Sequence, residues 1–356
     1  MHLTLFVPDL LWPDHEHRQA FEFDQADALA RFLFLAEHTA TPFKPTTSWE
    51  SVLAETFGIA GEAAALGALR LLGEPGSTDS QAFSHTLLCA DPVNLDFIQQ
   101  SLVLSSTDAS QLSVDDAQRL ITTLNEEFAD EGYFFLGHST NHWYFAPNSS
   151  DHDLANLAAC SRFLGRRIDA DESRQVLGSN GLRWLNRIQM CLNGHPVNEA
   201  RATQGLVAIN SVWPWGAGLL PNSAPPSTRR FDQAFGNNAL LRGLCTITGT
   251  AHLGKSPGNH GLLLNTDLAD AIAQDDLSAW KNATSQLAQT HIAPALGALA
   301  RGELTRLTII APDAHQTHHW TLAATHKGLN PTFLQRCLGR AHKHPALATL
   351  IGTWSR

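Results

Sequence analysis

The sequence is poor in charged residues and in cysteine, and it contains no long apolar run. Only 16% of its 356 residues are charged, and the formal net charge is -10. A chain this acidic has no general positive field with which to hold nucleic acid or an anionic membrane. Its five cysteines are scattered and form no C-x-x-C pair, which argues against a disulfide framework and against a cysteine zinc site. No stretch approaches the length of a membrane span.

The chain is long and apolar enough to bury a complete core. With 43% hydrophobic residues, it lies between one large α/β domain and two ordinary ones. We predict one domain over residues 1–356, in which helices and a hairpin over residues 105–165 form a small α+β insertion. The N-terminus carries an apolar run without a basic leader, which predicts a cytoplasmic protein.

Residues 183–218 hold the densest pattern in the chain. The apolar spacing over 184–191 predicts an amphipathic helix, and His195-Pro196 begins a second, short helix that stops at Gly205. Residues 206–209 predict a buried strand. The segment 210–218 contains two tryptophans, a proline and two glycines, which is typical of a loop where backbone and aromatic rings approach a ligand.

Asn198 and Arg201 lie three residues apart, on one face of the second helix. A guanidinium beside a carboxamide suits a carboxylate or phosphate ligand. The alternative is structural, with Arg201 paired to an acid elsewhere and Asn198 capping a turn. The spacing leaves both interpretations open.

This stretch resembles a known signature. The run HPVN-x2-R-x3-G over 195–205, followed by IN-x2-W-x-WG-x-G over 209–218, is similar to that of archaeal-type cofactor-independent phosphoglycerate mutases and a related bacterial group labelled as regulatory proteins. The resemblance implies the alkaline-phosphatase fold, an α/β architecture with a mostly parallel sheet flanked by helices. In active members, a Ser or Thr nucleophile and two divalent metals held by Asp and His carry a phosphoryl group. The ligand-side positions that it implies are Asn198, Arg201, Asn210, Trp213, Trp215 and Gly216.

The resemblance also implies a set of metal ligands, each of which follows a predicted strand. Carboxyl ends of strands are where open α/β sheets place functional groups. The predicted strands cover residues 3–7, 261–265 and 304–311. The candidates after them are Asp9, Asp267, Asp270, Asp313 and His315.

Alternatives stay open for the first of these positions and for the nucleophile. The glycine expected after Asp9 is Leu10 here, and an equal alternative is that Asp9 caps a turn. Ser77, which follows Gly76, is the nearest counterpart of the family nucleophile. A serine after a glycine is also an ordinary turn residue.

The chain departs from the family pattern mainly at the metal positions. No histidine follows Asp267 or Asp270 at the family spacing, and Ala314 separates Asp313 from His315. The bacterial group commonly has Asp-Pro-Val-His-Leu where this chain has Asn94 in place of the histidine. An incomplete ligand set usually gives weak metal binding or none.

Two functional hypotheses follow. The preferred one is a mutase-related protein that has lost the chemistry and binds a small phosphorylated or carboxylate ligand, or a protein partner, in a regulatory role. The alternative is an active phosphoglycerate mutase or phosphatase, with manganese or zinc on the metal candidates and Ser77 as nucleophile. Because function lies in the site and not in the fold, the resemblance by itself does not decide between them.

Overall fold

The protein is described by a computed structural model that covers residues 1–12, 27–44, 46–59, 64–76, 85–98, 101–107, 111–148, 157–220, 230–253 and 259–325. The chain divides into two compact units. The first unit takes residues 1–42, 231–236 and 252 onward, and the second takes residues 43–230 and 237–251. Each is described below by itself.

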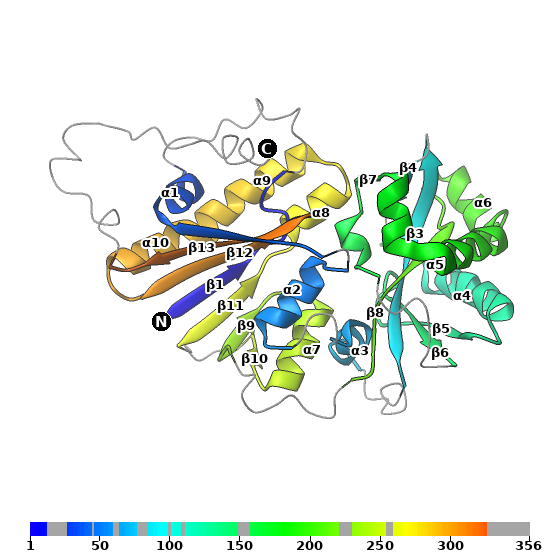
Figure 1. Ribbon diagram of the computed structural model, residues 1–356, viewed down its shortest axis with the longest axis horizontal. Coiled ribbons are helices and arrows are strands. Elements are labelled where there is room, and N and C mark those ends of the chain that lie inside the picture. The colour runs from blue at the N-terminus through cyan, green and yellow to red at the C-terminus, as the bar shows by residue number, and fades with distance from the viewer. Residues whose placement is uncertain are drawn as a thin grey trace. The chain divides into compact units, whose positions relative to one another are not determined.

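The first unit is built on a seven-stranded sheet in the order β10-β9-β11-β1-β12-β13-β2 (Figure 1). The neighbours β9, β11, β1 and β12 pair in parallel, whereas β13 and β2 are antiparallel additions at one edge. The strands are β1 (His2–Phe6), β2 (Glu37–Pro42), β9 (Gln233–Phe235), β10 (Ala251–His252), β11 (His260–Leu264), β12 (Arg306–Pro312) and β13 (Gln316–Ala323).

Helices cover a face of this sheet and bury the core against it. Apolar side chains of β1, β12 and β13 pack there against those of the helices. The helices are α1 (Ala28–Leu35), α8 (Asp267–Ala273), α9 (Leu277–Leu287), a π-helical turn (Ala288–Ile292) and α10 (Ala293–Ala300). Asp276 caps the N-terminus of α9, since its side chain accepts a 2.9 Å hydrogen bond from the backbone N–H of Ala279. The predicted α/β class with a mostly parallel, helix-flanked sheet is confirmed.

The second unit has a six-stranded antiparallel sheet organised around one long strand, β3. Its first half pairs with β8 and, at Leu88 and Cys89, with β6, whereas its second half pairs with β4. The strands are β3 (Leu87–Ile98), β4 (Ser101–Ser105), β5 (Gly132–Leu136), β6 (Trp143–Pro147), β7 (Arg167–Ile168) and β8 (Ser211–Gly218). The other elements are α2 (Trp49–Thr56), α3 (Leu66–Leu72), α4 (Val114–Glu127), a 3-10 turn (Cys160–Arg162), α5 (Ala170–Leu192), α6 (Pro196–Thr203) and α7 (Ala239–Thr248).

Helix α3 packs unusually closely against its neighbours because glycines line its contacts. A Cβ on Gly243 of α7 would lie 1.8 Å from the carbonyl oxygen of Leu69, and one on Gly67 would lie 2.9 Å from that of Leu87. Such approaches are open only to residues without a side chain. Helix α3 is therefore held tightly between α7 and the sheet of the second unit.

Several local predictions were wrong. Residues 206–209 are not a strand, and the segment 210–218, predicted as a loop, contains the whole of β8 instead. The sequence does not predict strand β13. Of residues 151–165, the described part, 157–165, contains the 3-10 turn. Ser113 caps α4, accepting a hydrogen bond from the N–H of Asp116.

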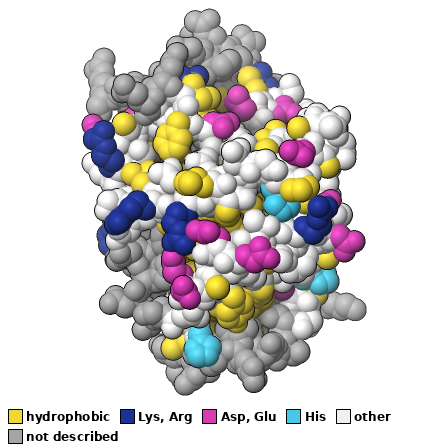
Figure 2. Space-filling view, turned by 90° about the vertical axis from the view of Figure 1, so that its right-hand side faces the viewer, with side chains coloured by type: hydrophobic (Ala, Val, Ile, Leu, Met, Phe, Trp, Pro, Cys, Tyr) yellow, Lys and Arg dark blue, Asp and Glu magenta, His cyan; other side chains and the backbone are white. Residues whose placement is uncertain are grey.

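Acidic and basic side chains alternate over the surface shown in Figure 2. On α4 and α5 the arginines lie beside acids: Arg119 pairs with Asp116, and Arg187 pairs with Glu127 and Glu131. Interspersed charges of both signs give this face no extended field of a single sign. Within the described part of the chain, no helix is long and apolar enough to cross a membrane.

Candidate functional site

Two regions of the molecule are candidate functional sites: the strand ends of the first unit and a cavity in the second. In the first unit, β11, β1 and β12 are parallel neighbours, with Phe6 in register with both Leu264 and Ile310. Their carboxyl ends therefore meet at one edge of the sheet. The segments that carry Asp9, Asp267 and Asp313 begin at that edge.

Asp313 is engaged by donors of its own turn and of β13. One carboxylate oxygen accepts hydrogen bonds from the N–H groups of His315 and Gln316, at 2.7 and 2.8 Å. The other lies 3.2 Å from Nε2 of His318, whose Nδ1 is 3.1 Å from Nε2 of His38 on β2. Burial raises the pKa of Asp313, but the hydrogen bonds from His318 and the backbone outweigh it and hold the pKa below the usual value.

Asp9 is almost completely buried and occupies a left-handed backbone conformation, with φ 56°. Its N–H donates to the carbonyl oxygen of Pro312, and its own carbonyl accepts a 3.0 Å hydrogen bond from the indole of Trp280. Leu10, which replaces the family's glycine, is fully buried in the core. A core position accounts physically for a large apolar side chain there.

The other two carboxylates lie on the first turn of α8 and have nearby protein donors. The side-chain amide of Asn265 donates to Asp267 at 2.9 Å, and the hydroxyl of Thr266 donates to Asp270 at 3.4 Å. Burial, together with the neighbouring Asp267 charge, raises the pKa of Asp270.

These residues do not fit the two-metal centre that the resemblance implies. Among the described residues, no group of three or more His, Cys, Asp or Glu side chains is placed to hold a metal ion. His315 is exposed, and its printed bond to Asp313 comes from the backbone and not from the imidazole. Ser77 lies outside the described residues, so its nucleophile role stays a prediction.

Asn198 and Arg201 are buried and brace the backbone that leads into β8. The amide of Asn198 bonds both the N–H and the carbonyl of Ile209, each at 2.9 Å. The guanidinium of Arg201 donates to the carbonyl oxygens of Val207, at 3.0 Å, and Thr107, at 2.6 Å. Their predicted ligand role stays a prediction, while these contacts give both side chains a structural role.

The remaining ligand-side positions serve the sheet, with one exception. Asn210 bonds the backbone of Leu95, and Trp213 is fully buried with its indole donating to the carbonyl of Ala158. Gly216 has φ 66°, and a Cβ there would lie 2.8 Å from Cβ of Leu66, so it permits close packing of β8 on α3. Trp215 is the exception, because it lines a cavity.

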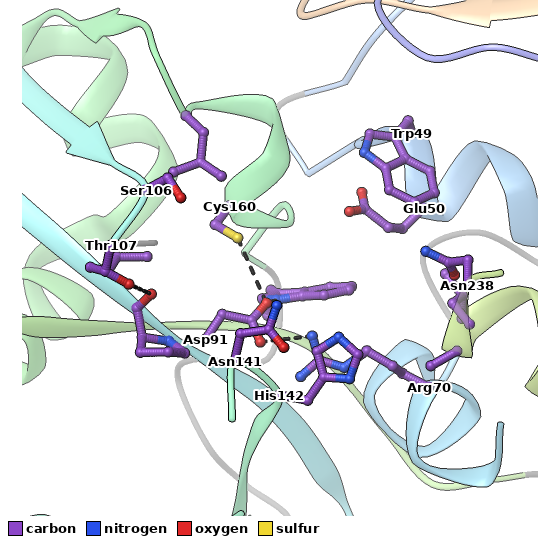
Figure 3. Close-up of a pocket in the computed structure, with 16 residues that line it drawn as sticks. Trp49, Glu50, Arg70, Asp91, Ser106, Thr107, Asn141, His142, Cys160 and Asn238 are labelled. Carbon is purple, nitrogen blue, oxygen red and sulfur yellow. Dashed lines mark hydrogen bonds and ion pairs between the residues drawn. The ribbon is translucent and has the colours of Figure 1, made fainter. Parts of the chain in front are cut away.

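That cavity lies wholly within the second unit and has a volume of about 240 Å³ (Figure 3). Helices α2, α3 and α7, strands β3 and β8, and the segments after β4 and before β6 contribute its walls. Its lining mixes carboxyl, amide, hydroxyl and indole groups. The lining residues are Trp49, Glu50, Arg70, Asp91, Pro92, Val93, Ser106, Thr107, Asn141, His142, Cys160, Leu164, Trp215, Asn238, Ala239 and Leu240.

Arg70 and Asp91 form a buried ion pair at the base of the cavity, with 2.7 Å between Nη1 and Oδ1. The other oxygen of Asp91 accepts a 2.7 Å hydrogen bond from the indole of Trp215. Arg70 also donates to the hydroxyl of Tyr144 and to the carbonyl of Trp143. Each buried charge therefore has a partner of opposite charge inside the protein.

A second polar group supports the cavity from behind. The carboxylate of Glu74 accepts hydrogen bonds from the Tyr144 hydroxyl and the backbone N–H of His138, and it lies 3.0 Å from Nδ1 of His142. Burial raises the pKa of Glu74, yet the bonds from His142 and Tyr144 hold it below the usual value. His142 thus faces the cavity with a carboxylate partner already behind it.

Glu50 is an acid of the cavity wall with a raised pKa. It is 6% exposed, and burial raises its pKa to about 7 despite hydrogen bonds from Ser161 and Ser48 and with some help from the Asp91 charge. Beside it, Nε1 of Trp49 is buried without a hydrogen-bond partner among the described residues. In Figure 3 the indole nitrogen of Trp49 and the carboxyl group of Glu50 point to the same side, into the cavity.

Cys160 contributes a neutral thiol. Its sulfur lies 3.7 Å from Asp91, and burial, then the charges of Asp91 and Glu50, raises its pKa well above the usual value. A thiol in this environment is a poor nucleophile at neutral pH.

Sequence reasoning missed most of this cavity. Two signals were present, because Arg70 interrupts the apolar helix LGALRLL and Asp91 interrupts the apolar strand run LLCADPV. A charged residue in a segment buried on all sides needs a partner, and each is the other's partner here.

Comparison with known proteins connects the chain to phosphoglycerate mutases over part of its length. A stretch of 123 residues is 30% identical to a 2,3-bisphosphoglycerate-independent phosphoglycerate mutase of Methanosarcina mazei, covering 33% of this chain and 30% of that protein. The corresponding mutase of Methanosarcina acetivorans is 29% identical over 137 residues, which are 37% of this chain and 32% of that protein. The matched stretch thus spans about a third of the length of these relatives. No family model matches the chain.

Two solved structures align along most of the chain at low similarity. A protein from Pyrococcus horikoshii aligns with a TM-score of 0.47 and 12% identity, covering 90% of this chain and 87% of that one. A cofactor-independent phosphoglycerate mutase from Thermoplasma acidophilum aligns with a TM-score of 0.33 and 13% identity, covering 91% and 89%. The relation to the mutases therefore rests on the sequence match.

Proposed function

We propose that this chain is a phosphoglycerate mutase-related protein that acts by binding a ligand or a protein partner in a regulatory role, without transferring phosphoryl groups. The sequence match to the Methanosarcina mutases supports the relation. The binding role is proposed for the cavity of the second unit, which combines a buried ion pair, a buried acid and an indole N–H without a partner in the described residues.

The hydrogen bonding of the acids at the strand ends supports the proposed loss of phosphoryl transfer. The carboxylate of Asp313 is committed to His318 and to two backbone N–H groups, and the acids on α8 have Asn265 and Thr266 as donors. A two-metal centre needs its carboxylates free to face the ions in a fixed geometry. Metal binding would first have to break these hydrogen bonds, and this would reduce the net free energy of metal binding. A dedicated metal site has no such hydrogen bonds to break.

The second candidate is an active mutase or phosphatase. It is favoured by the sequence match and by the three neighbouring strand ends that bring Asp9, Asp267 and Asp313 to one sheet edge. Under this candidate, divalent metal would rearrange the local hydrogen bonds, with Ser77 as the nucleophile.

The decisive experiment is elemental analysis of protein purified without chelator, combined with turnover of 3-phosphoglycerate on the same sample with added manganese. The binding-protein proposal expects no stoichiometric metal and no turnover. Stoichiometric metal with turnover that disappears in an Asp313→Asn variant would overturn it in favour of the enzyme.

The phosphorylated or carboxylate ligand predicted from the sequence depended on Arg201. Calorimetry with 3-phosphoglycerate tests this part separately, using wild type and Arg201→Lys. If Arg201 contacts the anion, the variant should bind it more weakly with little change in unfolding free energy. If Arg201 only braces the lead-in to β8, the variant loses stability and shows no specific loss of binding.

A further inference from the structure

We propose that the cavity of the second unit binds a small, uncharged, polyhydroxylated ligand of about the size of a monosaccharide. This inference rests on the proposed function only in taking the protein to act by binding. It adds the ligand class, and it differs from the phosphorylated or carboxylate ligand that the sequence predicted.

The charges around the cavity are balanced without a ligand. The guanidinium of Arg70 is paired with Asp91 at 2.7 Å, and His142 is backed by the carboxylate of Glu74 at 3.0 Å. Among the described residues that line the cavity, a phosphate or carboxylate would meet no unpaired cation, and it would lie near the carboxylates of Asp91 and Glu74. Unfavourable charge contacts of this kind are how a site rejects a ligand class.

The same balance disfavours a cationic ligand, because burial raises the pKa of Glu50 to about 7, so that its carboxyl is only partly ionised at neutral pH. Its carboxyl is buried, accepts a 2.9 Å hydrogen bond from Ser161 and lies near the negative charge of Asp91. A neutral carboxyl group can both donate and accept hydrogen bonds, which matches a hydroxyl group and not an ammonium.

The hydrogen-bonding groups of the wall match the same ligand. Asn141, Ser106 and Asn238 add amide and hydroxyl groups that donate and accept. Nε1 of Trp49 is a buried donor without an acceptor in the described part of the protein, although native structures seldom leave such groups unsatisfied. A ligand oxygen would satisfy it, while the indoles of Trp49 and Trp215 offer apolar area to the C–H face of a ring.

The volume of the cavity limits the size of the ligand. The volume of about 240 Å³ lies below the roughly 300–1,000 Å³ of sites that hold drug-sized molecules. One small polar metabolite fits in this volume, whereas an oligomer of such molecules would extend out of the cavity.

The test is calorimetric titration of the full-length protein with D-glucose, D-galactose and myo-inositol, compared with the charged analogues D-glucosamine and D-glucuronate. These probes share a six-membered ring and differ in charge. We expect at least one neutral probe to bind at millimolar concentration or below, and to bind about tenfold more tightly than glucosamine or glucuronate.

Two matched variants locate the binding. Trp49→Phe keeps an aromatic ring but removes the N–H, and it should weaken binding of the neutral probe about tenfold. Trp184→Phe is the control, because Nε1 of Trp184 is likewise buried without a partner in the described residues but does not line the cavity. It should leave the affinity unchanged, and thermal unfolding of both variants checks that each is folded.

Three results would overturn the inference: no binding by any neutral probe at millimolar concentration, tighter binding by a charged analogue, or equal affinities in wild type and Trp49→Phe. These outcomes are separate from failure of the proposed function. That failure is shown by metal content and by turnover of 3-phosphoglycerate, whether or not a neutral sugar binds.

Discussion

The strand ends of the first unit and the cavity of the second treat buried polar groups in opposite ways. At the strand ends, Asp313 is saturated by His318 and by the backbone of its own turn. In the cavity wall, Glu50 keeps a pKa of about 7 despite its hydrogen bond from Ser161, and Nε1 of Trp49 has no partner among the described residues. A buried polar group that already has hydrogen-bond partners stabilises the fold, whereas one that lacks a partner can still form a hydrogen bond with a ligand.

This difference adds a candidate site that the sequence did not predict. The family signature directed attention to the acids after the strands and to the segment around Arg201. In the structure, both of these are part of the internal hydrogen bonding. The cavity is instead assembled from residues that no local motif connects.

Breaking the buried ion pair of the cavity should have the largest effect. Arg70→Met leaves Asp91 buried without a counter-charge, and we expect a loss of about 3–5 kcal/mol in the free energy of unfolding. The measurement is urea denaturation. The matched control is Arg301→Met, which removes an exposed ion pair with Glu303 and should change the free energy of unfolding little. Equal losses in the two variants would mean that the cavity pair is not truly buried.

Removing the saturated acid of the first unit should have the next largest effect. Asp313→Ala removes the acceptor for His318 and for two backbone N–H groups, and we expect a loss of about 2–3 kcal/mol. The pKa of Asp313 is lower in the folded protein than in the unfolded chain, so this contribution is present above pH 3.8 and disappears as pH falls through the lowered pKa.

The same variant distinguishes a structural acid from a metal ligand. Unfolding should show the same loss with and without chelator if Asp313 serves the hydrogen bonds. A loss seen only without chelator would mean that wild type holds a metal there, contrary to our interpretation.

The sequence predicted the framework of the first unit well, because that framework is local. Short apolar runs predicted the strands β1, β11 and β12 of this unit. It failed where pairing overrides local preference. Strand β8 contains a proline and a positive-φ glycine that favour a turn, but its pairing with β3 keeps it extended. The His-rich segment of β13 similarly adopts a strand by pairing with β12 and β2.

The cavity could not be predicted in the same way. Glu50, Arg70 and Asp91 come from α2, α3 and β3, so their proximity depends on tertiary packing and not on spacing. The glycine contacts that hold α3 against its neighbours involve Gly67 and Gly243, which lie far apart in the chain. A single sequence shows each of these residues and gives no means of pairing them.

Neutralising the perturbed acid of the cavity should stabilise the protein, in contrast to the first two variants. The pKa of Glu50 is raised to about 7 in the folded protein against 4.5 for the unfolded chain, so wild type loses stability as pH rises from 4.5 to 7. Asp91 and the thiols of Cys89 and Cys160 are the titratable groups facing it, with Arg70 balanced by Asp91.

Glu50→Gln removes that ionisation. We expect the variant to be more stable than wild type by roughly 1–3 kcal/mol at pH 8, with the difference shrinking toward zero near pH 4. Chemical denaturation at a series of pH values measures it. A difference that does not change with pH would show that Glu50 does not titrate in this range.

Removing the unsatisfied indole N–H should have the smallest effect on stability. In the free protein, Trp49→Phe deletes a buried donor that has no acceptor in the described residues, so it should be nearly neutral or stabilising by up to about 1 kcal/mol. Trp213→Phe is the contrast, because its indole donates a 2.9 Å hydrogen bond to the carbonyl of Ala158, and its loss should cost about 1–2 kcal/mol. A Trp49→Phe variant as destabilised as Trp213→Phe would mean that the Trp49 N–H already has a partner. The cavity would then offer a ligand one hydrogen-bond donor fewer.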